Sequence, residues 1–81
     1  MKYVVINVID REILKVGVAD TPTGATEILK NDFMNEWYDN GHTNEDFENE
    51  VGCGDEWELN ATDAWMNTSN ANYDWRIIEV D

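Results

Sequence analysis

Two segments near the N-terminus alternate apolar and other residues, which is typical of β-strands. Residues 3–9 place Val4, Ile6 and Val8 on one face, and Tyr3, Val5, Asn7 and Ile9 on the other. Residues 13–19 repeat the pattern, with Leu14, Val16 and Val18 pointing one way. Because residues 10–12 between them are short enough for a tight connection, the pattern predicts an N-terminal β-hairpin. The pattern does not determine the type of turn in this hairpin.

From Ala25 onward the apolar spacing changes to steps of three and four, the period of one helix face. The stripe consists of Ala25, Ile28, Leu29, Phe33 and Trp37. Thr21 or Thr23 can cap the start of this helix, Pro22 suits its first turn, and Gly41 can close its end. We therefore expect a main helix over residues 24–39 that packs its stripe against the hairpin.

The rest of the chain predicts shorter elements. Thr43 can cap a short second helix anchored by Phe47 and Val51. Residues 56–59 alternate like a strand, with Trp57 and Leu59 on one face. After Asn60, residues 60–66 predict one or two helical turns, then a loop, and residues 74–80 predict a last strand with Ile78 on its inner face.

This order of elements predicts a single small acidic α+β domain spanning residues 1–81. We expect a small antiparallel or mixed sheet, made of the N-terminal β-hairpin plus one or two later strands, packed against one main helix. The expected core consists of Val4, Ile6, Val8, Leu14, Val16, Val18, Ile28, Leu29, Phe33, Trp37, Trp57, Leu59 and Ile78.

Charge is distributed unevenly along the chain. The formal net charge is −13, and residues 31–75 contain twelve carboxylates and no lysine or arginine. The rest of the chain is nearly balanced, with six acids and five bases. No apolar stretch is long enough to span a membrane, and Cys53 is the single cysteine, so we expect a cytoplasmic protein without a disulfide.

Catalytic and metal-binding chemistry is poorly supported by the sequence. Cys53 and His42 are the only residues of their types, and neighbouring carboxylates would raise the pKa of the thiol and weaken it as a nucleophile. Zinc needs more such ligands, and the acidic stretch does not match the twelve-residue calcium loop. We therefore expect no enzyme activity, no metal and no cofactor, with an irregular calcium site as an open alternative.

Direct binding to nucleic acid is also opposed, because affinity for phosphates comes from lysine and arginine. A protein that nucleic acid repels can instead attract proteins that bind nucleic acid. In size, charge and lack of a catalytic constellation, the chain resembles the small acidic anti-CRISPR and anti-restriction DNA mimics of phages and mobile elements. That resemblance concerns overall character and implies no particular fold.

The sequence thus suggests an inhibitor that presents DNA-like negative charge to a basic, nucleic-acid-binding host protein. We expect the binding residues to be the carboxylates of the middle block and nearby aromatic residues. They are Asp32, Glu36, Asp39, Glu45, Asp46, Glu48, Glu50, Asp55, Glu56, Glu58, Tyr38, Trp57 and Trp65. The alternative is an accessory domain whose acidic surface serves solubility.

Overall fold

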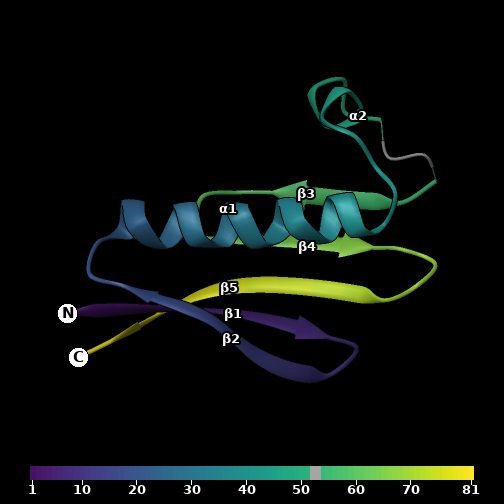
Figure 1. Cartoon of the computed structure of the whole chain (residues 1–81). Coiled ribbons are helices and arrows are strands. Elements are labelled where there is room, and N and C mark those ends of the chain that lie inside the picture. The colour runs from purple at the N-terminus through teal and green to yellow at the C-terminus, as the bar shows by residue number, and fades with distance from the viewer. Residues whose placement is uncertain (52–53) are drawn as a thin grey trace.

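The computed structural model describes residues 1–51 and 54–81, so Cys53 lies outside the described residues. Two helices and five strands follow one another in the part of the chain that is described (Figure 1). Their order is β1 (Lys2–Ile9), β2 (Glu12–Ala19), α1 (Pro22–Asp39), α2 (Asn44–Glu48), β3 (Glu56–Leu59), β4 (Asp63–Asn67) and β5 (Asn72–Val80). Within the described ranges, no helix is long and apolar enough to cross a membrane.

The strands form one sheet in the order β2-β1-β5-β4-β3, and every neighbouring pair is antiparallel. The predicted β1–β2 hairpin is confirmed, and Asp10 and Arg11 in its tight turn both adopt positive φ angles. Strand β5 pairs with β1 and so joins the hairpin to the β3-β4-β5 meander. The α+β class is confirmed, although three strands follow the hairpin instead of one or two.

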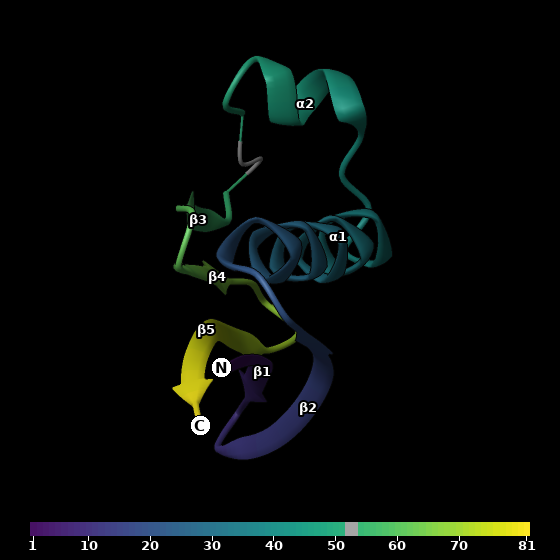
Figure 2. The same cartoon turned by 90° about the vertical axis from the view of Figure 1, so that its left-hand side faces the viewer.

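The main helix follows from its capping residues and its apolar stripe. Thr21 caps α1 by accepting a hydrogen bond from the backbone N–H of Gly24 at 3.1 Å, and Pro22 occupies the first turn. Four residues of the predicted stripe are buried: Ala25, Leu29, Phe33 and Trp37. Figure 2 looks along α1 and shows the sheet curling around this helix, which leaves the other sheet face open.

The face of strand β1 that packs against the helix is not the face that we expected. Val5 and Asn7 are buried under α1, whereas Val4, Ile6 and Val8 lie on the open face. The core prediction was also wrong for Leu14, Val18 and Ile78, which are all exposed. The hydrophobic pattern did not decide the face of β1, because both of its faces are largely apolar. Strand β5 does decide it, since its buried side is the one with Tyr73 and Trp75.

The predicted helical turns over residues 60–66 were wrong, because residues 63–67 form strand β4. Asn60 stabilises a turn: its backbone N–H donates to the Asp63 carbonyl and its side-chain amide to the Asp63 carboxylate, both at 2.9 Å. Ala64 and Met66 are buried, and the intervening Trp65 points to the open face. The alternation has a period of two, which is that of a strand.

The short second helix is confirmed, with Thr43 as its cap. Phe47 anchors it against Phe33, Trp37 and Trp57 in the aromatic core. Val51, the second expected anchor, is instead 45% exposed. Because α2 has a single apolar anchor, it stands apart from the sheet above α1 and β3 (Figure 2).

Candidate functional site

Several expected binding residues meet in an open hollow beside β3, which we call the β3 hollow. Its volume is about 620 Å³. It is lined by Glu50, Asp55, Glu56, Trp57, Glu58, Leu59, Asn60 and Trp65. Four carboxylates therefore line the hollow together with the Trp65 indole, and no lysine or arginine is among these lining residues.

Strand β3 positions the centre of the hollow. Its alternation turns Trp57 and Leu59 toward α1, so Glu56 and Glu58 project from the open face, roughly 6.6 Å apart. Trp65 of β4 lies directly opposite Glu58 and donates its indole N–H to the Glu58 carboxylate at 3.3 Å. The pair fixes an aromatic surface beside a negative charge, the combination that suits an arginine or lysine side chain.

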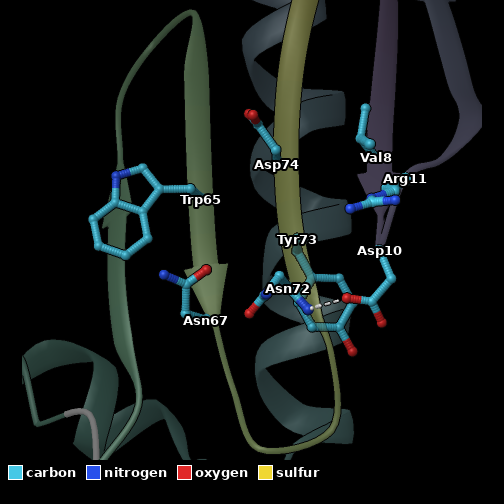
Figure 3. A pocket seen from close by; sticks show the side chains of 8 residues that line it. All are labelled: Val8, Asp10, Arg11, Trp65, Asn67, Asn72, Tyr73 and Asp74. Carbon is cyan, nitrogen blue, oxygen red and sulfur yellow. Dashed lines mark hydrogen bonds between the residues drawn. The ribbon is translucent and has the colours of Figure 1, made fainter.

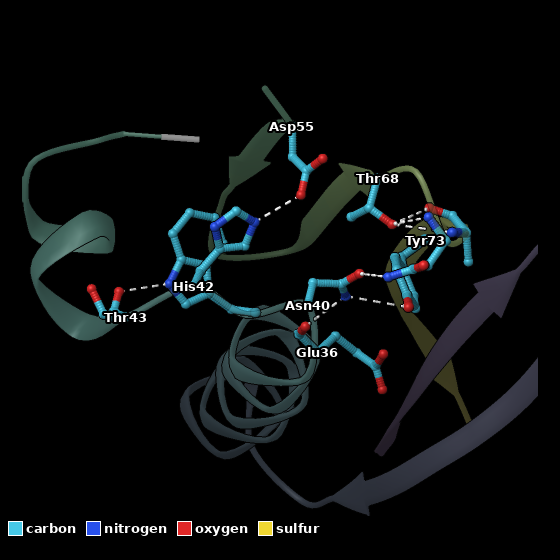
Figure 4. Close-up of polar contacts among 10 residues, drawn as sticks. Glu36, Asn40, His42, Thr43, Asp55, Thr68 and Tyr73 are labelled. Atoms are coloured by element: carbon cyan, nitrogen blue, oxygen red, sulfur yellow. Dashed lines mark hydrogen bonds and ion pairs between the residues drawn. The ribbon is translucent and has the colours of Figure 1, made fainter. Parts of the chain in front are cut away.

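The segment between α1 and β3 is tied to the core at both ends. His42 is buried and stacks on Trp37 with ring centroids 4.1 Å apart. Its Nε2 atom lies 2.7 Å from a carboxylate oxygen of Asp55, at the entry to β3 (Figure 4). The Trp37 indole N–H donates to the carbonyl of Thr43 at 2.9 Å. These contacts fix Asp55, so it has a structural partner as well as a place in the hollow.

Helix α2 carries the remaining loop carboxylates. Glu45 and Asp46 lie in its first turn, where the helix dipole favours negative charge, and Glu48 ends it. Glu50 follows with a positive φ angle of 57° and reaches the hollow. Tyr38 is exposed, and its hydroxyl hydrogen-bonds to the side chain of Asn44, which links α1 to this segment.

The carboxylates of α1 do not join the β3 hollow. Asp32 and Glu36 line a separate hollow beside β2, at the opposite edge of the sheet from β3. Asp32 is half-buried and accepts hydrogen bonds from the Trp75 indole N–H at 2.8 Å and from the Asn7 amide at 3.3 Å. Asp39 is exposed near the end of the helix. The expected residues are therefore divided among the β3 hollow, α2 and α1, and they do not form one face.

The surroundings of Glu36 favour the protonated form of its carboxyl group. Partial burial raises the pKa of its carboxyl above the usual value, and repulsion from Asp32 and Asp39 raises it further. A hydrogen bond with the Tyr73 hydroxyl opposes this shift. Burial likewise raises the pKa of Tyr73, whose hydroxyl accepts a hydrogen bond from Asn40 at 3.4 Å (Figure 4).

Glu36 should therefore make stability fall as pH rises. Its native pKa is raised, so the folded chain retains a proton that the unfolded chain has lost, and stability decreases between the model-peptide value of 4.5 and the raised native value. Replacing Glu36 with glutamine should stabilise the domain at neutral pH and remove this part of the pH dependence. Melting temperatures of the natural chain and of Glu36→Gln, measured at about pH 7 and about pH 5, check this.

The matched control is Glu27→Gln, which removes the same charge from an exposed position on the same helix. The difference between natural chain and variant should shrink on acidification for Glu36→Gln and not for Glu27→Gln. Equal pH responses of the two variants would show that net charge, not the environment of Glu36, governs the effect.

A second hollow, of about 470 Å³, lies on the other side of Trp65 (Figure 3). It is lined by Val8, Asp10, Arg11, Trp65, Asn67, Asn72, Tyr73 and Asp74. The Asp10 carboxylate accepts a hydrogen bond from the backbone N–H of Asn72 at 3.0 Å. We did not expect the polar residues of this hollow to form a site. The alternation along residues 63–67 was a signal for it, because it places Trp65 and Asn67 on the same face of β4.

Within the described ranges, histidine, cysteine and acidic side chains form no group of three or more that could hold a metal ion. The residues that line the β3 hollow offer negative charge, carboxylate acceptors for hydrogen bonds from cationic donors, and an indole for stacking. Comparisons with protein-family models, with curated proteins and with solved structures find no match.

Proposed function

We propose that this chain is a non-enzymatic module that binds a basic, nucleic-acid-binding protein through the β3 hollow. The observation that carries the proposal is the lining of that hollow, in which four carboxylates lie around Trp65 without a cation among them. In this role the carboxylates take the place that nucleic-acid phosphates occupy on the partner. The partner's lysines and arginines then meet negative charge on a folded protein surface.

Electrostatics and the indole make separate contributions to such binding. A net charge of −13 attracts a basic partner over long range and speeds association, an effect that salt screens. Glu56 and Glu58 supply acceptors for charge-assisted hydrogen bonds, which are shorter and stronger than neutral ones. Trp65 supplies a flat ring on which a guanidinium can stack, and such aromatic anchors slow dissociation.

The biological role that fits this chemistry is inhibition. A protein that occupies the basic groove of a cytoplasmic nucleic-acid-binding protein excludes its nucleic acid. Phage and mobile-element proteins that oppose CRISPR or restriction systems act in this manner, and the chain shares their size and acidity. We propose on these chemical grounds that the chain belongs to that class of anti-defence inhibitors.

The test is competition with DNA for a partner captured from nuclease-treated lysate at low salt. Reversing Glu56 and Glu58 together to lysine should weaken binding by about a hundredfold, because two cationic contacts become repulsive. The control reverses Glu12 and Glu27, which are exposed elsewhere on the chain and change the net charge equally. The control should weaken binding by less than about fivefold.

Two results would count against the proposal. If the partner binds DNA and this protein at the same time, the carboxylates do not imitate phosphates and the acidic surface serves solubility. If both pairs of reversals weaken binding equally, the partner responds to net charge and the β3 hollow is not the site.

A further inference from the structure

The second hollow, of about 470 Å³ and on the other side of Trp65 from the β3 hollow, differs in its charge; we call it the Arg11 hollow. Among the described residues that line the two hollows, Arg11 is the only cation. It is exposed, and its guanidinium forms no ion pair or hydrogen bond with another residue in the described ranges. Figure 3 shows this guanidinium and the Trp65 indole at opposite sides of the hollow.

The backbone at Arg11 is in a conformation that favours glycine. Asp10 and Arg11 are the two central residues of the hairpin turn, because Ile9 pairs with Glu12. Their φ angles are 47° and 80°, both in the left-handed region. Turns of this kind prefer Asn-Gly or Asp-Gly, since glycine enters that region without a steric penalty. Backbone strain of this sort is concentrated at functional sites, which directs attention to the side chain of Arg11.

The carboxylates of the Arg11 hollow already have donors. Asp74 accepts a hydrogen bond from the Arg76 guanidinium at 3.2 Å. The Asp10 carboxylate accepts one from the backbone N–H of Asn72 at 3.0 Å. The unsatisfied group in this hollow is therefore the guanidinium of Arg11, which needs an acceptor.

A carboxylate is the acceptor that suits these donors. A guanidinium can bind both oxygens of a carboxylate at once, which a single amide oxygen does not allow. Asn67 and Asn72 are exposed and line the same hollow, so their side-chain amides can donate to the same group. A nucleic-acid phosphate has similar oxygens, but a chain with a net charge of −13 repels the polyanion that carries it.

We propose that Arg11 binds a carboxylate of the partner protein while an arginine or lysine of the same partner occupies the β3 hollow. This inference rests on the proposed function and specifies the partner's surface. Glu58, Trp65, Asp74 and Val8 pair in one row across β3, β4, β5 and β1. Three strand spacings of about 4.8 Å make this row roughly 14 Å long, and the turn with Arg11 follows β1. The partner should therefore present a cation and a carboxylate roughly 10–15 Å apart.

The charge of Arg11 makes this contact distinguishable from general attraction. Removing the guanidinium makes the chain more negative by one charge. If net charge alone governs binding, a basic partner should then bind more tightly. If Arg11 holds a carboxylate, the same change should weaken binding, because the partner's carboxylate loses its donors. The two explanations predict changes of opposite sign.

The experiment measures the affinity of the full chain and its variants for the partner captured from lysate, at one salt concentration. Arg11→Gln should weaken binding about tenfold, since hydrogen bonds between charged groups are lost. The matched control is Lys30→Gln, which removes the same charge from an exposed position on α1. It should leave the affinity within about twofold of the natural chain or raise it. Arg11→Lys keeps the charge without the planar fork and should retain part of the affinity.

Arg11→Gly separates binding from folding. It removes the side chain and the strain of a positive φ angle together, so its melting temperature should not fall below that of the natural chain. Its affinity should nevertheless fall as far as that of Arg11→Gln. Weak binding by a variant that is at least as stable cannot be attributed to unfolding.

The outcomes distinguish this contact from the proposed function. If Arg11→Gln binds as tightly as Lys30→Gln while reversal of Glu56 and Glu58 still weakens binding, the Arg11 contact is wrong and the proposed function stands. If no partner is captured, or if neither change weakens binding, both proposals are wrong. If the chain itself binds DNA and Arg11→Gln abolishes that binding, Arg11 holds a phosphate, which overturns the inference of a carboxylate.

Discussion

Replacing Asp32 with alanine should destabilise the domain by about 2–6 kcal/mol. Asp32 accepts hydrogen bonds from the Trp75 indole and the Asn7 amide, and both donors belong to buried residues. Without the carboxylate each donor would be buried without a partner, which costs about 1–3 kcal/mol per group. An 81-residue domain has roughly 4–12 kcal/mol of total stability, so the loss would be a large share of it. Urea unfolding at neutral pH measures the difference.

The control for this prediction is Asp39→Ala, which removes a carboxylate from an exposed position on the same helix. Its effect should stay within about 0.5 kcal/mol. Asp32→Asn keeps an acceptor oxygen and should lose less than Asp32→Ala. If Asp32→Ala and Asp39→Ala unfold at the same urea concentration, the hydrogen bonds from Trp75 and Asn7 contribute nothing and Asp32 is available for binding after all.

Asp32 also shows where helical spacing misleads. Asp32, Glu36 and Asp39 recur at steps of four and three, which predicted a row of exposed negative charge. Positions 32 and 36 each precede a residue of the buried stripe, so they flank the face that packs on the sheet. Spacing alone does not reveal that Asn7 and Trp75, from the two ends of the chain, place donors beside that flank. The sequence predicted the helix but not the role of its carboxylates.

The strands show a related limit. The sequence correctly predicted that Glu56 and Glu58 share the exposed side of β3. The segment 56–59 alternates charged and apolar residues, so one side of the strand is charged and the other is apolar. Strand β1 is largely apolar on both faces, and the choice between them depends on pairing with β5, far away in the sequence. The face of β1 that alternation indicated as the core is therefore the open face of the sheet. Such a strand is typical of a sheet that is covered on both sides.

Strand β4 was missed because Asn60 suits two local structures. It can cap a helix or stabilise a turn through its side-chain amide, and its partner Asp63 selects the turn. Residues 64–66 could have indicated the strand, since Ala64 and Met66 share one side and Trp65 the other. Without β4, the sequence could not place Trp65 opposite Glu58, and the β3 hollow could not be predicted as a unit.

Replacing Phe47 with alanine should show that the shape of the acidic surface matters as well as its charge. Phe47 stacks on Trp57 with ring centroids 5.2 Å apart and contacts Phe33 and Trp37 at 6.3 and 5.8 Å. Losing a half-buried ring should cost about 2–3 kcal/mol, less than the loss of a fully buried one. A helix as short as α2 is not stable without tertiary packing, so this segment should loosen before the sheet does.

This loosening would reach the proposed site through Glu50, which follows α2 and lines the β3 hollow. Phe47→Ala should therefore weaken partner binding about tenfold although the net charge is unchanged. Urea unfolding, amide exchange over residues 44–51 and partner affinity are the measurements, and Val51→Ala, at an exposed position, is the control. If amide protection over residues 44–51 survives in Phe47→Ala, the aromatic contact does not hold α2. If protection is lost but affinity is unchanged, the carboxylates act by charge alone and their arrangement by α2 has no part in recognition.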